Sequence, residues 1–280
     1  MPVKLTNSAS VIIVNVLRRS SYALFVPFFI LSFSIASSAE EDSCALQAPH
    51  HRVSVRFVND GDTLTLPNDK RVRIIGINTP EIGYKDRPDQ PLAVRAQQRL
   101  RAYLHNDHAL IVNDEDRYDK YGRVLAHVFD AQGNNVGAKL IREGLGFAIS
   151  IPPNLRYRKC YRDAEQHARR TKQGVWAEPY FAPVAANKLK YSGFNRVLGC
   201  IQRVRKYRDK KYLYLSDRFR FLIPEQSEIY FEADAPPMIF EKGRCLIGTG
   251  WVYNQYSYRT MKLLHPDAAK IMRTTFEANE

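Results

Sequence analysis

The stretch from residue 56 to residue 81, RFVNDGDTLTLPNDKRVRIIGINTPE, constrains the fold more than any other part of the chain. Asp60-Gly61 lies between two alternating apolar runs and is typical of a hairpin turn. Residues 73–77 predict a buried strand, which must stop near Pro80 because proline has no N–H for a sheet ladder. The turn and the strand end should therefore bring polar side chains together.

These side chains are of the types that metal-assisted phosphodiester cleavage needs. Asp62, Asn78 and Glu81 offer oxygen ligands, which hard cations prefer, and Arg73 offers a guanidinium suited to phosphate. Each feature also has an ordinary explanation, since Asp-Gly-Asp is often only a turn and Thr-Pro-Glu can be only a helix cap. The joint spacing of the features favours a site.

Three motifs together resemble the staphylococcal nuclease (thermonuclease) family. They are DGDT at 60–63, R-x5-T-P-E at 73–81 and DKYGR at 119–123, in the family's order and spacing. Residues 138–146 (AKLIREGLG) resemble the helix that follows, and Trp176 falls where the family's domain closes. The resemblance covers roughly residues 50 to 178 and implies an OB-fold-like, five-stranded barrel.

The resemblance also implies a calcium-dependent nuclease that cuts DNA, RNA or both and leaves 3′-phosphate ends. Asp62, Asn78 and the backbone carbonyl of Thr79 are the implied Ca²⁺ ligands. Lys120 and Tyr121 are implied to contact the neighbouring phosphate.

Catalysis falls, by the same resemblance, to Glu81, Arg73 and Arg123. Glu81 would hold or deprotonate the attacking water. The two arginines would clamp the phosphoryl oxygens, because a planar guanidinium donates two parallel hydrogen bonds.

The chain departs from the family pattern at two places. Asn78 stands where the family has an aspartate, which removes one negative charge from the metal site. Residues 147–153 (FAISIPP) replace the base-stacking tyrosines, so stacking must be weaker or come from elsewhere.

The first 39 residues have the pattern of a secretory signal peptide. Lys4, Arg18 and Arg19 precede an uncharged, mostly apolar run at 22–36, and Ala39 ends a small-residue cleavage site. An uncleaved membrane anchor is the alternative, although the apolar run is short for a spanning helix. We therefore expect an exported protein, periplasmic or secreted, with no stable membrane insertion after cleavage.

The charge of the expected mature chain points to a polyanionic partner. Without the three basic residues of the signal it carries 39 Lys and Arg against 29 Asp and Glu, a net charge of +10. Such a protein is attracted to nucleic acid, although solubility or an anionic envelope surface would also explain the charge. The motifs favour DNA, RNA or both as the partner, and no feature indicates an obligate protein partner.

Four cysteines remain in the mature chain, and none has zinc-site spacing. An oxidising compartment would give two disulfides, in one of three pairings. The expected domain boundaries favour Cys44–Cys160 and Cys200–Cys245, because each bond then stays inside one domain.

Periodicity predicts a mainly β protein with helices (α+β). The boundaries we expect are a nuclease-like domain at 45–178, a linker at 179–192 and a C-terminal β domain at 193–268. The first domain should have strands at 52–58, 62–67, 70–77, 109–113 and 123–129, and helices at 92–104, 135–144 and 155–171.

The C-terminal domain should be small and all-β, either a barrel, with an OB-like barrel as one option, or a sandwich. Its expected strands are 195–206, 211–216, 219–223, 228–232, 244–253 and 259–264. Residues 191–222 carry nine Lys and Arg and two Asp, interleaved with aromatic residues. They could bind single strands by phosphate contact and stacking, or the aromatic residues could simply form the core under a solvated face.

Three functions remain open at this stage. The first is an active, exported, calcium-dependent nuclease. The second is a nuclease-like module that binds nucleic acid with weak or no catalysis, and the third is an envelope structural protein. Glu81 with both arginines favours the first, because a pure binder needs no general base.

Overall fold

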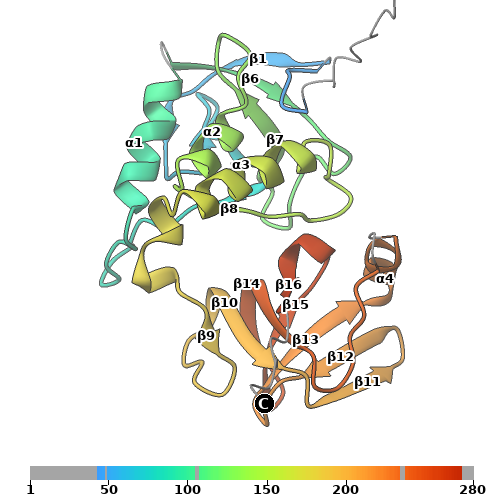
Figure 1. Ribbon diagram of the computed structural model, residues 1–280. Coiled ribbons are helices and arrows are strands. Elements are labelled where there is room, and N and C mark those ends of the chain that lie inside the picture. Colours follow the sequence, from blue (N-terminus) through green and yellow to red (C-terminus); the bar gives the residue numbers. More distant parts are fainter. Residues whose placement is uncertain (1–42, 48, 105–106, 234–236, 273–280) are drawn as a thin grey trace, which may run out of the picture. The chain divides into compact units, whose positions relative to one another are not determined.

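The computed structural model describes residues 43–47, 49–104, 107–233 and 237–272, all of which belong to the unit that runs from Glu41 (Figure 1). The expected signal peptide lies outside the described residues. Strands predominate and helices accompany them, as the predicted α+β class requires. Within the described ranges, no helix is long and apolar enough to cross a membrane.

The first sheet has six strands in the order β1-β6-β7-β4-β3-β2. They are β1 (His51–Ser54), β2 (Phe57–Val58), β3 (Thr63–Thr65), β4 (Arg71–Ile74), β6 (His108–Val112) and β7 (Val124–Phe129). β1 and β2 come from the single strand predicted at 52–58, and the chain bends between them. The Val55 amide donates to the Asp107 carbonyl next to β6 at 2.7 Å, whereas the Arg56 amide donates to the Thr65 carbonyl of β3 at 2.8 Å. One bent strand thus pairs with both ends of the sheet, which is consistent with the expected five-stranded, OB-like barrel.

Three helices pack with this sheet, close to the predicted positions: α1 (Ala93–Tyr103), α2 (Val136–Arg142) and α3 (Arg158–Arg170). The Asn135 side chain caps α2 by accepting the Ala138 amide at 3.0 Å. Leu64 and Val72 of the strands, Leu100 of α1 and Tyr161 of α3 share one buried hydrophobic core. The barrel and its helices therefore fold around a common interior.

The predicted strand 70–77 is interrupted at Gly76, where φ is +85°. A Cβ there would lie 2.1 Å from the Tyr161 ring, so the close approach to α3 requires glycine. Beyond it, β5 (Ile77–Asn78) leaves the barrel sheet and pairs with β8 (Phe147–Ala148). This change of partner separates Asn78 and Thr79 from the strand that carries Arg73.

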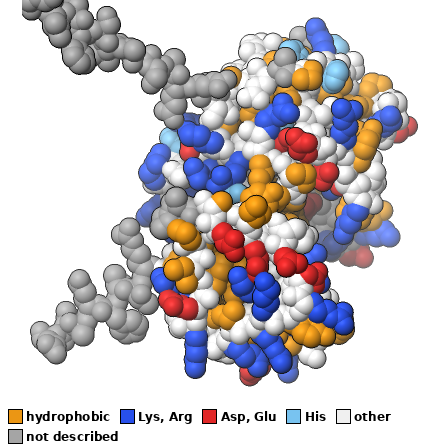
Figure 2. All heavy atoms as spheres, turned by 90° about the vertical axis from the view of Figure 1, so that its right-hand side faces the viewer, with side chains coloured by type: hydrophobic (Ala, Val, Ile, Leu, Met, Phe, Trp, Pro, Cys, Tyr) orange, Lys and Arg blue, Asp and Glu red, His pale blue; other side chains and the backbone are white. Residues whose placement is uncertain are grey.

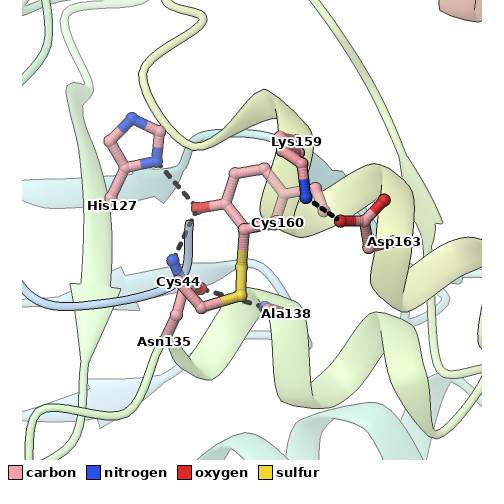
Figure 3. Close-up of a disulfide and its surroundings, with 8 residues drawn as sticks. Cys44, His127, Asn135, Ala138, Lys159, Cys160 and Asp163 are labelled. Atoms are coloured by element: carbon pink, nitrogen blue, oxygen red, sulfur yellow. Dashed lines mark hydrogen bonds and ion pairs between the residues drawn. A yellow bond between two sulfur atoms is a disulfide. The ribbon is translucent and has the colours of Figure 1, made fainter. Parts of the chain in front are cut away.

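Both disulfides join the pairs that the expected domain boundaries favour. Cys44–Cys160 links the N-terminal segment to α3 across 116 residues, close to the start of α2 (Figure 3). Nearby, His127 of β7 shares a 2.7 Å hydrogen bond with the hydroxyl of Tyr161. Cys200–Cys245 joins two adjacent strands of the second sheet.

The second sheet has eight strands, in the order β11-β12-β13-β15-β14-β10-β9, with β16 also paired to β14. They are β9 (Val184–Ala185), β10 (Gly193–Cys200), β11 (Arg203–Tyr207), β12 (Lys210–Tyr214), β13 (Phe219–Pro224), β14 (Cys245–Gln255), β15 (Tyr258–Lys262) and β16 (Ala269–Ile271). One face of this sheet carries a second hydrophobic core, which includes Leu213, Phe219, Phe221, Leu246 and Met261.

Two strand predictions for this region are wrong. Residues 195–206 form two strands, β10 and β11, rather than one. The strand predicted at 228–232 is part of a helix, α4 (Glu225–Glu232), so the region is not all-β. Pro224 is the N-cap residue of this helix. Glu225 and Glu228 lie in its first turn, where the positive end of the helix dipole stabilises their negative charge, and the side chains of Ser227 and Phe231 are buried. These helix signals outweigh the β propensity of Ile229-Tyr230-Phe231.

Candidate active site

The predicted hairpin places Asp62 at the edge of the barrel, next to the strand end. The Asn59 amide donates to the Thr63 carbonyl at 2.9 Å and closes the turn between β2 and β3. The buried Asp62 carboxylate accepts the Thr63 hydroxyl at 3.0 Å and the Thr79 amide at 2.9 Å. Two segments separated by 17 residues are thus fixed to each other through one carboxylate.

Arg73 holds the same place together from β4. Its Nη1 donates to the carbonyls of Ile74 and Ile77 at 2.5 and 2.8 Å. Its Nη2 lies 3.1 Å from Asp62 Oδ2 and 3.4 Å from Asn78 Oδ1. The buried guanidinium therefore has a fixed orientation and neutralises part of the charge of Asp62.

The charges of Asp62 and Arg73 also act on two nearby carboxylates, Asp60 and Glu81. Desolvation, followed by the charges of Asp62 and Glu81, raises the pKa of Asp60 to about 7. The hydrogen bond from the Asp62 amide and the charge of Arg73 oppose this rise. Desolvation and the charge of Asp62 also raise the pKa of Glu81, although Arg73 and Arg123 oppose the shift. The charge of Asp62 thus disfavours the ionisation of both Asp60 and Glu81.

The DKYGR segment forms a tight turn before β7 that presents Arg123. Asp119 accepts the amides of Tyr121 and Arg123 at 2.9 and 3.0 Å and pairs with the Arg123 guanidinium at 2.7 Å. Tyr121 is 72% exposed, and Lys120 Nζ lies 5.0 Å from the centre of its ring. Asp119 is therefore a structural partner of Arg123, and it leaves Lys120 and Tyr121 at the surface.

A cleft of about 920 Å³ gathers the residues that the sequence singled out. Its walls include Asp62, Arg73, Asn78, Glu81, Lys120, Tyr121 and Arg123. Thr79 is not on the wall, but its amide is bonded to Asp62. Residues that are up to 61 positions apart in the chain thus share one open space.

The donor chemistry of the cleft fits a hard cation. Asp60, Asp62 and Glu81 bring three carboxylates to the cleft, and Asn78 adds a neutral oxygen, while Thr79 lies behind the wall with its amide bonded to Asp62. A divalent cation would relieve the repulsion between Asp62 and the other two carboxylates. Among the described residues, no three His, Cys, Asp or Glu side chains form a ready-made ligand cluster, so phosphate and water oxygens would have to complete the coordination shell.

Sequence reasoning missed two parts of this site. The sequence pattern predicts only a turn role for Asp60, although Asp60-Gly61-Asp62 has both carboxylates at one turn. The second omission is the far wall of the cleft, where Thr249, Trp251, Tyr253 and Lys262 of the C-terminal region lie. No motif marks these residues, because they come from a different sheet.

Contacts between the two regions explain how this wall is held. Asp267 accepts the Ser150 hydroxyl at 2.7 Å and pairs with the Arg158 guanidinium at 2.6 Å. Phe147 of β8, which pairs with the strand of Asn78, contacts Phe194 of β10 with ring centres 5.2 Å apart. The second sheet is thus anchored beside the strand pair that carries part of the site.

Comparison with known proteins agrees with this geometry. The family model described as "Staphylococcal nuclease homologue" matches residues 71–178. The thermonuclease of Staphylococcus intermedius is 36% identical over 127 residues, which are 44% of this chain and 74% of that protein. Endonuclease YncB of Bacillus subtilis is 31% identical over 166 residues, which are 55% of this chain and 74% of that protein. The match to three quarters of a thermonuclease, together with the shared motifs in one cleft, shows that the chain belongs to the staphylococcal nuclease family.

Proposed function

We propose that this protein is a calcium-dependent nuclease that hydrolyses phosphodiester bonds of DNA, RNA or both. The observation that carries the proposal is the cleft in which Glu81, Arg73 and Arg123 face a carboxylate-rich donor set. Two of its relatives are a thermonuclease and an endonuclease by name. When bound by Asp62, Asn78 and the Thr79 carbonyl, Ca²⁺ would supply charge neutralisation for one phosphate oxygen.

Side chains of the protein activate the water and stabilise the transition state. Glu81 holds the attacking water and takes its proton. Arg123, oriented by Asp119, and Arg73, oriented by two carbonyls and Asp62, donate to the phosphoryl oxygens as negative charge builds up. Because Asp119 holds Nε of Arg123, its two Nη groups are oriented before substrate binds. Arg73 would donate through Nε, or through Nη2 after exchanging Asn78 for a phosphoryl oxygen. As the water oxygen bonds to phosphorus, the P–O5′ bond breaks and the leaving 5′-oxygen takes up a proton from solvent, so the expected products carry 3′-phosphate and 5′-hydroxyl ends.

The protein acts outside the cytoplasm under this proposal. Two disulfides suit an oxidising compartment. The signal-like residues 1–39 are the second support. A site with one directly bound carboxylate is expected to bind Ca²⁺ weakly, in the range of about 10⁻⁴–10⁻³ M typical of extracellular modules.

The decisive test is digestion of DNA and RNA by residues 40–280, with Ca²⁺ and with chelator. Glu81→Gln and Arg123→Ala should each lower turnover about 100- to 1,000-fold. Two exposed residues outside the cleft serve as matched controls, Glu115→Gln and Arg117→Ala, and should digest at the parent's rate. A Glu81→Gln enzyme as fast as the parent would show that the water-activating role is wrong.

Two other outcomes would replace the proposal. Binding of nucleic acid without cleavage at saturating Ca²⁺ would make the protein a nuclease-like binding module, as the missing charge at Asn78 could explain. If the protein neither binds nor cleaves nucleic acid but binds anionic envelope polymers, it is a structural protein.

A further inference from the structure

One face of the second sheet differs in composition from its other face. The strand registers align Tyr253, Thr260, Arg220, Tyr214 and Arg203 in one row across β14, β15, β13, β12 and β11. A second row, two residues further along, aligns Lys262, Leu222, Tyr212 and Arg205. We call these two rows, together with Trp251 and Tyr258, the aromatic-basic face. The opposite face is the hydrophobic core around Phe219, Phe221 and Met261.

Arg220 at the centre of this face is buried without a counter-ion. It is 7% exposed, and its hydrogen bonds go to the neutral oxygens of Thr260, Tyr214 and Gln255 at 3.3, 3.5 and 3.1 Å. Its guanidinium also lies 4.4 Å from the ring centre of Tyr212 and 4.6 Å from that of Tyr258. No ion pair joins it to a carboxylate within the described residues. A buried charge of this kind gains from an anion placed above it.

Acidic residues are missing from the strand positions of the face. The charged residues that strands β11 to β15 place there are Arg and Lys, and none is Asp or Glu. The acid that neutralises this region, Glu228 of α4, pairs with Lys206 and Lys211 at 3.3 and 3.2 Å, and both lysines alternate to the other face. On the side of the molecule drawn in Figure 2, Lys and Arg side chains are mixed with Asp and Glu. Among the described strand positions of the face, every charged side chain is therefore positive, while Asp267 lines the cleft beside Trp251 and Lys262.

One end of the face is the wall of the catalytic cleft. Trp251, Tyr253 and Lys262 line the same space as Glu81 and Arg123. Trp251 is 41% exposed, and Lys262 Nζ lies 6.0 Å from the ring centre of Tyr253. At the other end, Arg203 and Arg205 are exposed on the edge strand β11, and Arg203 stacks on Tyr214 at 4.2 Å. The face thus runs from the cleft across four strand spacings, or about 19 Å.

We propose that the aromatic-basic face binds a single-stranded segment of the nucleic acid that enters the catalytic cleft. Trp251 offers an exposed ring on which a base can stack, while Lys262, Arg203 and Arg205 contact successive phosphates above the fixed charge of Arg220. Stacking needs unpaired bases, so the face selects single strands over duplexes. It would supply the stacking that residues 147–153 lack. The inference rests on the proposed nuclease function for the identity of the ligand.

Binding can be measured apart from cleavage. Residues 40–280 are titrated, in chelator, into a fluorescent oligothymidylate of about 16 nucleotides and into a duplex of the same length. We expect tighter binding of the single strand. Trp251→Ala should weaken that binding about tenfold to a hundredfold, because stacking energy is lost. Lys262→Gln should reduce the salt dependence by about 0.7 in the slope of log K against log [salt], as expected for one lost phosphate contact.

Matched variants separate a binding role from an effect on folding. Lys242→Gln makes the same chemical change at an exposed lysine in the turn before β14, away from the face, and should leave the slope unchanged. Arg203→Gln with Arg205→Gln, at exposed positions of the edge strand, should reduce the slope by about 1.4. The proposal would be overturned if the Trp251→Ala variant and the Arg203→Gln, Arg205→Gln variant both bound the single strand as tightly as the parent. It would also be overturned if the parent and all variants bound the duplex as tightly as the single strand. The binding assay contains no Ca²⁺ and therefore does not depend on cleavage. Absence of cleavage in the separate digestion assay would overturn the nuclease function and would leave the binding result intact.

Discussion

At the scale of single residues, Arg73 and Arg123 share a charge and a cleft but are held differently. Arg73 is buried and bonded to two carbonyls and to buried Asp62. Arg123 is half-buried and pairs with Asp119 four residues away. The first guanidinium is therefore part of the fold as well as of the site, whereas the second mainly serves the site.

Arg73→Ala should lower the free energy of unfolding by about 3–5 kcal/mol, because it leaves a buried carboxylate without its partner. Arg123→Ala should cost less than about 1 kcal/mol, since a partly exposed pair contributes little. Urea denaturation of both variants in chelator measures the difference. Equal losses would mean that the burial of the Arg73–Asp62 pair has no energetic consequence.

Asn78 is the position at which a negative charge can be added to the proposed metal site. Its Oδ1 lies 3.4 Å from Arg73 Nη2, beside Asp62. Asn78→Asp should tighten Ca²⁺ binding and lower the Ca²⁺ concentration for half-maximal cleavage, because affinity rises with the number of ligand charges. Turnover at saturation need not rise, since the added charge also repels the substrate phosphate. A Ca²⁺ titration of both proteins measures the effect, and identical half-saturation points would remove residue 78 from the ligand set.

At the scale of elements, the two disulfides protect different parts of the chain. Cys44–Cys160 ties the segment before β1 to α3, and Cys200–Cys245 ties β10 to β14. Both constrain the unfolded chain, and the first closes the longer loop, 116 residues against 45.

Replacing Cys44 and Cys160 by serine should destabilise the protein by about 2–5 kcal/mol. The matched Cys200 and Cys245 double variant should lose about 0.8 kcal/mol less if chain entropy alone sets the difference. Guanidinium denaturation of the two variants tests this ranking. Intact mass of the parent should lie four hydrogens below the reduced value, and free thiols in exported material would contradict both bonds.

At the scale of the whole molecule, the C-terminal region adds a wall to the cleft but supplies none of the proposed catalytic groups. Every proposed catalytic and metal-binding residue precedes Ala182, where a truncated chain can end. The truncation removes Phe194 and Asp267, which contact Phe147 and Arg158. The nuclease chemistry and the single-strand contact should therefore be separable.

Residues 40–182 should still cut nucleic acid, with weaker apparent affinity for single strands and a shallower salt dependence, because fewer phosphates are neutralised. Cleavage rates at several salt concentrations, compared with the full mature chain, measure the change. Asp267→Asn in the full chain is the control, because it weakens one contact between the regions and keeps the second sheet. An unchanged salt slope after truncation would show that the C-terminal region does not hold substrate.

The sequence by itself determined the parts of this protein that depend on short-range geometry. Asp62, Arg73, Asn78 and Glu81 could be grouped because a turn and a strand end fix their positions locally. The helices around the barrel followed from apolar periodicity, and the favoured cysteine pairs followed from the expected domain boundaries. The predicted strand at 228–232 failed because Ile229-Tyr230-Phe231 has β propensity, while the helix signals lie in the flanking residues.

Only the tertiary structure decided how these parts meet. Alternation along β12 and β13 predicted two faces but not which one is core, and the fold puts Phe219 and Phe221 inside while Tyr212, Tyr214 and Arg220 lie on the other side. The barrel closes because the chain bends at Val55 and reaches both ends of the sheet. The Val55 amide bonds to the Asp107 carbonyl and the Arg56 amide to the Thr65 carbonyl, and no local pattern encodes these two contacts. Trp251 joins the wall of the Glu81 cleft for the same reason: 170 residues separate them in the chain, and only packing between the two sheets brings them together.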